Sequence, residues 1–150
     1  MVGIVKRRLP VFSTFVKTLL DDTTAAAFLT TLGVTVDTYT PTLTNTTNID
    51  ASTANTTYYI NIGDKAVIVW GIVGIDCTAA ASTASDMGMS LPVASALGAS
   101  TQMGGNATAA DLPSSIRIVA DATNDRARFQ WASQSASNLN FGFLFGYPIL

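Results

Sequence analysis

The sequence predicts a mainly β protein: an antiparallel β-sandwich, jelly-roll-like, preceded by an extended N-terminal arm and one short α-helix. After residue 33 the hydrophobic pattern changes to a period of two, which is typical of strands with one buried face. Seven or eight such segments are separated by turn residues. Glutamate is absent and Thr, Ser and Ala are abundant, which disfavours a helical bundle with a Glu- and Lys-covered surface.

Composition excludes several kinds of active site. The 150 residues fit one domain, or a smaller domain with an arm, and include no histidine and a single cysteine. A histidine-based triad, a Cys/His dyad, a Cys/His zinc site and an internal disulfide all need residues that are missing. We therefore expect a protein that is not an enzyme and that needs no metal or cofactor.

Charge and hydropathy exclude two kinds of partner. The net charge is −2 and only 12% of residues are charged, whereas binding to nucleic acid depends on neutralising phosphates. The N-terminal apolar stretch is interrupted by Pro10 and Lys17, and the longest later apolar run, residues 66–75, is too short to span a bilayer. We expect no nucleic-acid partner and no membrane insertion.

The first 20 residues show no helical period and are predicted to be an extended arm. The next segment, residues 20–33, is predicted to be a short helix, with Asp21 or Asp22 at its N-terminus and Gly33 in the left-handed position at its end. Its apolar face repeats at i, i+3, i+4 and i+7 and consists of Ala25, Phe28, Leu29 and Leu32. A helix of this length is marginal by itself, so something else must pack on that face.

The strands are predicted in chain order. Residues 35–44 form a Thr-rich strand that Pro41 restricts to an edge or bend, and residues 44–55 form a loop. Residues 57–62 and 66–75 form a hairpin across residues 63–65. The strand at 66–75 is apolar on both faces, which indicates a central position with a second surface to be covered.

The second half of the chain continues this pattern. Residues 76–86 and 93–100 are predicted to be loops, and the strands are 87–92, a weak strand at 101–109 with a bulge at its two glycines, a hairpin of 115–121 with 126–132, and 140–147. In the last strand every aromatic residue points to one face, which is the clearest strand pattern of the sequence. The loops 44–55, 79–85 and 93–105 are candidate recognition segments.

Some residues permit chemical as well as structural interpretations. Two aspartates could cleave a glycosidic bond, but nothing in the sequence fixes such a pair. Asp121 and Asp125 are arranged as in the start of a calcium loop without its glycine and glutamate, so a hairpin turn is favoured. Cys77 is expected to be a small buried side chain. Five aromatic residues could stack on sugars if exposed, although burial is favoured for each: Tyr58, Tyr59, Trp70, Trp131 and Tyr147.

Residues 20–34 resemble a module, LDD-x-x-AAA-x-x-TTLG, that recurs in fibre proteins of tailed bacteriophages. The remainder resembles a domain found at the ends of phage and prophage fibres, and the two together cover residues 20–150. The matching stretches are residues 40–45, 67–76, 78–80, 89–92 and 120–127 and the aromatic last strand.

The resemblance implies a structural virion protein that assembles as a homotrimer, with residues 1–34 as attachment arm and trimerisation helix and residues 35–150 as the β-sandwich head. It implies a tail fibre or spike component whose tip attaches to the host surface, through a glycan or a protein. The alternative is a capsid decoration protein or head fibre with an architectural role. Receptor-binding residues are not identified.

The arm is expected to dock on another virion protein. The residues predicted to do so are Lys6, Arg7, Arg8, Phe12 and Phe15. Three basic charges would bind an acidic membrane surface only weakly, so a protein partner is favoured.

Overall fold

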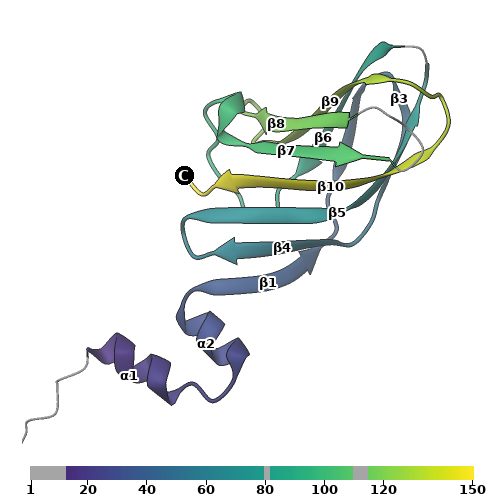
Figure 1. The fold of residues 1–150 in the computed structure, drawn as a ribbon. Coiled ribbons are helices and arrows are strands. Elements are labelled where there is room, and N and C mark those ends of the chain that lie inside the picture. Colours follow the sequence, from purple (N-terminus) through teal and green to yellow (C-terminus); the bar gives the residue numbers. More distant parts are fainter. Residues whose placement is uncertain (1–12, 80–81, 110–114) are drawn as a thin grey trace, which may run out of the picture.

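A computed structural model describes residues 13–79, 82–109 and 115–150 (Figure 1). The protein is mainly β, with two short helices, α1 (Thr14–Asp21) and α2 (Ala25–Thr31), and a 3-10 turn, η1 (Ser100–Gln102). The strands are β1 (Val34–Tyr39), β2 (Leu43–Thr47), β3 (Ile49–Ala54), β4 (Thr57–Ile62), β5 (Ala66–Cys77), β6 (Thr83–Ser90), β7 (Gly104–Thr108), β8 (Ser115–Asp121), β9 (Arg126–Ser133) and β10 (Leu139–Pro148).

All ten strands belong to one antiparallel sheet in the order β1-β4-β5-β10-β7-β8-β9-β6-β2, with β3 paired to the second half of β5. The sheet curls into a half-barrel, so that β6 and β9 lie behind β5 and β10 in Figure 1. The predicted mainly β, antiparallel fold is confirmed, whereas a jelly-roll sandwich is not. We call β1, β4, β5 and β10 the apolar limb, and β6, β8 and β9 the charged limb.

The core lies on the inner face of the curled sheet. Alternate residues of β5 and β10 point inward, as the last strand's pattern predicted: Val67, Val69, Val73, Ile75, Phe141, Phe143, Phe145 and Tyr147 are all buried. From the charged limb, Phe129 packs edge-on against Phe143 and Phe145, with ring centroids 5.6 and 6.4 Å apart. Aromatic contacts across the core therefore hold the two limbs together.

The N-terminal helices differ from the prediction in two ways. Residues 14–21 form helix α1 instead of an extended arm, because the Ser13 side chain accepts a hydrogen bond from the Val16 N–H and caps its first turn. Helix α2 occurs where expected, but its cap is Thr24, which accepts from the Ala27 N–H at 3.1 Å, and not Asp21 or Asp22. Gly33 ends it with a φ of 76°, as predicted.

The Thr-rich region after α2 was predicted least well. Residues 35–44 are split at Pro41 into β1 and β2, which lie at opposite ends of the sheet order. The predicted loop at 44–55 is instead part of β2 and all of β3. Asn48, at a φ of 57°, makes the turn between them, and its side chain donates to Ser85, Ser133 and the Ala79 carbonyl. No local sequence pattern predicts these long-range hydrogen bonds.

Most of the remaining strands are close to their predicted positions, but β6 begins at Thr83, inside the predicted loop 76–86. β7 pairs with β10 and β8 without a register shift, so the predicted bulge at its glycines is wrong. The β8–β9 hairpin is confirmed, and residues 122–125 form its turn. The Asp121 carboxylate there accepts hydrogen bonds from Asn124 and Arg126, and Asp125 accepts from the backbone of Ser95 and Leu97.

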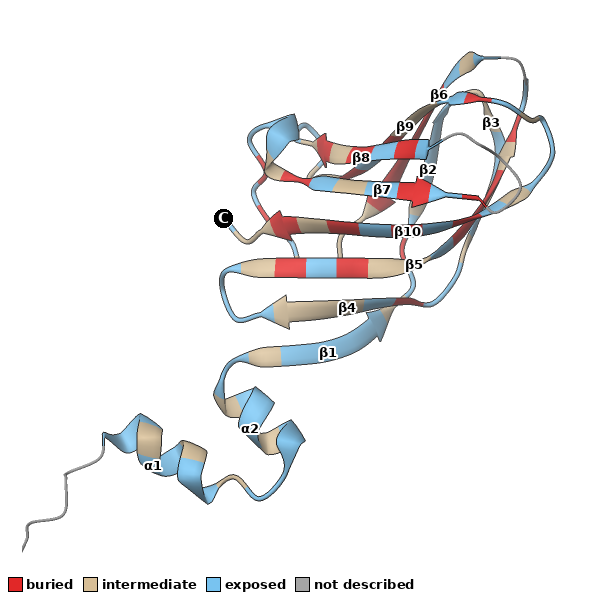
Figure 2. Cartoon of the chain, viewed as in Figure 1, coloured by how far each residue is buried: buried red, intermediate tan, exposed pale blue. Residues whose placement is uncertain are grey.

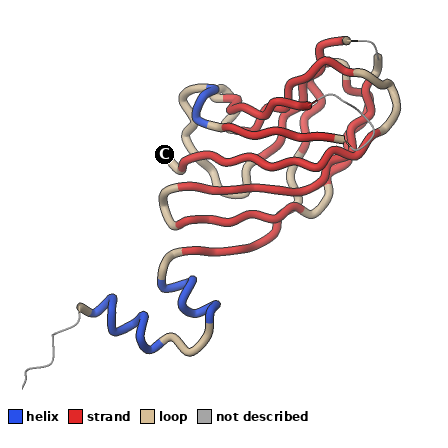
Figure 3. The backbone as a smooth tube through the Cα atoms, in the orientation of Figure 1, coloured by secondary structure: helices blue, strands red, loops and turns tan. Residues whose placement is uncertain are grey.

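Within the described residues, no helix is long and apolar enough to cross a membrane. Figure 2 shows that α1 and α2 carry no buried residue, while the buried positions concentrate in the sheet. The described chain thus consists of a sheet and a helical segment beside it (Figure 3). Apolar side chains of the helical segment are exposed, among them Phe15, Leu20 and Phe28.

Candidate functional site

The outer faces of the two limbs are chemically different. On the charged limb, outward side chains are held in pairs: Arg126 with Asp121 and Arg128 with Asp86. On the apolar limb, the outward positions of β5 are Ile68, Trp70 and Ile72, and they alternate with the buried valines. The sequence prediction that this strand has a second apolar face is therefore confirmed, and Ile68 and Ile72 on that face are exposed among the described residues.

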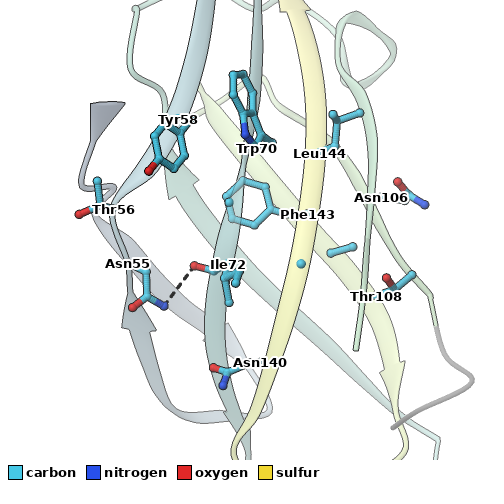
Figure 4. A pocket seen from close by; sticks show the side chains of 13 residues that line it. Asn55, Thr56, Tyr58, Trp70, Ile72, Asn106, Thr108, Asn140, Phe143 and Leu144 are labelled. Carbon is cyan, nitrogen blue, oxygen red and sulfur yellow. Dashed lines mark hydrogen bonds between the residues drawn. The ribbon is translucent and has the colours of Figure 1, made fainter. Parts of the chain in front are cut away.

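A groove of about 850 Å³ lies on the outer face of the apolar limb and extends to β7 (Figure 4). Tyr58 of β4 and Trp70 of β5 lie on one side, and Asn106 and Thr108 of β7 lie on the other. This volume is in the range of sites for small ligands. We name it the outer groove.

The aromatic side of the outer groove is a stacked pair. Tyr58 and Trp70 are cross-strand partners, with ring planes 15° apart and centroids 5.8 Å apart. Tyr58 is 50% exposed. Leu144, which pairs with Trp70 from the other neighbouring strand, is 54% exposed. Cross-strand pairing thus fixes a flat apolar surface at the protein–water boundary.

Amide side chains line the rest of the groove. Asn55 donates a hydrogen bond to the Ile72 carbonyl at 3.2 Å, which leaves its own carbonyl oxygen available. The side chains of Asn106 and Asn140 make no hydrogen bond to any other described residue. Each amide can both donate and accept. None of the residues lining the groove is charged.

A glycine forms the middle of the groove. Gly142 lies in register between Ile72 of β5 and Thr108 of β7, so its missing side chain would point outward between them. A Cβ atom built at Gly142 would meet nothing within 4 Å. The space between the aromatic and amide sides is therefore open because of this residue.

The predicted attachment residues are only partly described. Lys6, Arg7, Arg8 and Phe12 lie outside the described residues, while Phe15 lies on α1 with about half its surface exposed. Their docking on another virion protein stays a prediction.

The predicted trimer helix residues are on α2 and at its C-terminal end. Ala25, Phe28, Leu29 and Leu32 are all exposed, so none of them is buried by the residues that the structure describes. Helix α2 adjoins the sheet because Gly63 of the β4–β5 hairpin donates to the Gly33 carbonyl at 2.7 Å. Three apolar residues of strands β1, β4 and β5 are exposed as well: Val36, Ile62 and Ile68. We name Phe28, Leu29, Leu32, Val36, Ile62 and Ile68 together the stem strip.

The five aromatic candidates divide between core and groove. Tyr147 is buried and donates to the Val93 carbonyl at 2.7 Å, while Tyr59 and Trp131 pack against the core. Burial raises the pKa of Tyr147, so it stays a neutral donor. Only Tyr58 and Trp70 line the groove. The preference for burial is confirmed for Tyr147, whereas Tyr59 and Trp131 are only partly buried.

The described residues show no cluster of three or more potential metal ligands among His, Cys, Asp and Glu. Cys77 is buried, as predicted, and burial raises the pKa of its thiol, which keeps it protonated.

Sequence reasoning did not find Asn55, Asn106, Asn140 and Gly142 as site residues. They are separated by up to 87 positions in the chain and meet only because β10 pairs with both β5 and β7. The available signal was the Gly-Leu-Gly alternation opposite the aromatic residues of β10. This pattern indicates that the outward face of β10 has few large side chains. Only the strand order shows which residues lie beside that face.

A comparison with models of known protein families finds no match, and a comparison with curated protein sequences finds none either. Functional inference for this chain therefore depends on its own residues and geometry.

Proposed function

We propose that this chain is a structural virion protein of a tailed bacteriophage, a homotrimeric tail fibre or spike component that attaches to the host surface. The main supporting observation is that neither helix buries a residue although α2 carries Phe28 and Leu29 and is followed by Leu32. Helices of seven and eight residues are not stable alone. Copies of the chain packed through these side chains would supply the missing contacts.

The stem strip supports the same proposal because exposed apolar residues occur on β1, β4 and β5 as well as at helix α2. Its members are all aliphatic or aromatic, and exposed apolar patches often mark interfaces between proteins. The charged limb is less suited to self-association, since its outward charges already have partners. We therefore place the interface between copies at the stem strip.

In this proposal residues 1–34 attach and trimerise, and residues 35–150 form the head. The head is a curled antiparallel sheet whose two limbs enclose one core between them. The protein acts by binding and not by catalysis, and it needs no cofactor. The resemblance of residues 20–34 to phage fibre modules supports the virion location, and capsid decoration is the alternative.

Light scattering of the purified full chain tests the assembly. We expect a mass three times 15.7 kDa. Leu29→Asp places a charge in the packed surface and should shift the mass toward that of one chain, because an unpaired buried charge is costly. The matched control is Thr30→Asp, an exposed neighbour on the same helix that lies outside the stem strip, and it should keep the trimer.

A wild-type protein that is monomeric at all concentrations would contradict the trimer, and equal effects of the two substitutions would remove α2 from the interface. Gold-labelled antibody against the chain, applied to purified phage particles from the culture that produces it, tests the location. Label at the tail supports the fibre or spike. Label across the capsid faces would instead support capsid decoration.

A further inference from the structure

We infer that the outer groove binds an uncharged glycan, a chain of neutral hexose or N-acetylhexosamine units. This deepens the proposed host attachment by naming the ligand class, and it depends on that proposal only for the biological source of the glycan. The binding itself follows from three properties of the groove.

The first property is the aromatic pair. One face of a pyranose ring carries mainly C–H groups, and an aromatic ring offers a flat apolar surface of similar size. Tyr58 and Trp70 present such a surface at the solvent boundary, extended by Leu144. Because their rings are stacked on each other, the platform is ordered before a ligand arrives, which reduces the entropy lost on binding.

The second property is the set of amides facing this platform. Sugar hydroxyls both donate and accept, so they are best matched by groups that do the same. Asn106 and Asn140 have side-chain amides without partners among the described residues, and Asn55 has an unused carbonyl oxygen. Thr56 and Thr108 add hydroxyl groups at the two sides.

The third property is the absence of charge in the lining. A carboxylate, sulfate or phosphate on the ligand would lose water without gaining an ionic partner, which is unfavourable. The nearest basic residue across the sheet, Arg117, pairs with Asn106 in register but donates to Gln130 and does not line the groove. Neutral sugars are thus preferred over acidic ones.

A second copy of the chain is a less suitable occupant of this groove. The stem strip is purely apolar, as expected of a surface that is buried between copies. The outer groove combines the aromatic pair with amides, and a packed apolar partner would leave Asn106 and Asn140 buried without hydrogen bonds. The two surfaces are therefore assigned to different occupants.

The test uses the full chain, fluorescently labelled, on a printed array of neutral and acidic glycans. We expect retention by one group of neutral glycans. Trp70→Ala removes half of the platform and should weaken that retention at least tenfold. Gly142→Ile should have the same effect, because its stiff side chain fills the open middle of the groove. A β-branched residue is well tolerated in a strand, so the fold should persist.

The matched control is Gly104→Ile. Gly104 also has nothing within 4 Å of a built Cβ atom and lies on β7, but it does not line the groove. Its variant should bind like wild type. Thermal unfolding of both glycine variants checks that they are folded.

Retention of no neutral glycan, retention of acidic glycans only, or equal binding by the Gly142→Ile and Gly104→Ile variants would overturn the inference. Dissociation of the oligomer by Gly142→Ile would also overturn it, because the groove would then lie between copies. Light scattering on the same samples separates this inference from the proposed assembly. A trimer that binds no glycan contradicts only the groove, and a monomer that binds neutral glycans contradicts only the trimer.

Discussion

The two limbs of the sheet share one core but present opposite outer surfaces. On the charged limb, outward side chains are partnered within the chain, as Arg126 is with Asp121 and Arg128 with Asp86. On the apolar limb, Ile72 and Leu144 are more than half exposed and have no such partners. The outward charges of the charged limb are paired within the chain, whereas the apolar limb carries both surfaces that we propose to bind partners.

The largest expected effect tests whether the core lies only on the inner face of the apolar limb. Phe145 and Leu144 are neighbours on β10, one fully buried and the other largely exposed. Phe145→Ala should lower the free energy of unfolding by about 3–5 kcal/mol through the cavity it leaves. Leu144→Ala should cost less than about 1 kcal/mol. Urea unfolding at equal protein concentration measures both, and similar losses would erase the distinction between the faces.

A smaller effect tests the same distinction on β7 with two adjacent glycines. A Cβ atom at Gly105 would collide with the Leu144 carbonyl oxygen and with Phe145, whereas one at Gly104 would meet nothing within 4 Å. Gly105→Ala should therefore cost about 1–3 kcal/mol. Gly104→Ala should leave stability unchanged or raise it by up to about 1 kcal/mol, since alanine reduces the freedom of the unfolded chain. Unfolding curves that rank the two variants in the reverse order would contradict the placement of β7.

The smallest effect concerns the charged limb and depends on pH. Burial by itself would raise the pKa of Asp121, but hydrogen bonds from Asn124 and Arg126 outweigh it and lower that pKa. The carboxylate therefore stabilises the folded state above its unfolded pKa of about 3.9, and this contribution is lost as the pH falls through and below that value. Asp121→Asn should cost about 1 kcal/mol at neutral pH.

The difference between wild type and Asp121→Asn should shrink as the solution is acidified. Thermal unfolding across a pH series measures it. A difference that stays constant with pH would show that the charge of the Asp121 carboxylate does not stabilise the folded state. The ion pairs of the charged limb would then contribute less to stability than their geometry indicates.

Elements with a strong local pattern were predicted well. β10 follows from the alternation of aromatic residues, and the β4–β5 and β8–β9 hairpins follow from turn residues between alternating segments. Helix α1 was missed although its apolar residues Phe15, Val16, Leu19 and Leu20 have helical spacing, because the segment is only eight residues long. The strands at 43–54 were missed because Asn and Thr favour turns, and the Asn48 side chain reaches partners up to 85 residues away.

The stem strip and the outer groove also differ in how far they could be predicted from the sequence. The helix face and the two-sided apolar strand at 66–75 could be recognised from spacing alone, because both depend on residues close together in the chain. The neighbours of Trp70 could not be recognised from spacing. Tyr58, Leu144 and Asn106 are brought to it by pairing between β4, β5, β10 and β7.

By itself the sequence determined the chemistry that is available: aspartates without histidine, one cysteine, many hydroxyls and a strand with two apolar faces. It also determined which side chains of each strand share a face, since a strand's period of two is local. Only the tertiary structure decided that the strands form one curled sheet, that Phe129 closes the core, and that an open glycine separates an aromatic pair from unpartnered amides. Strand order depends on contacts between distant segments, and these are fixed when the whole core packs.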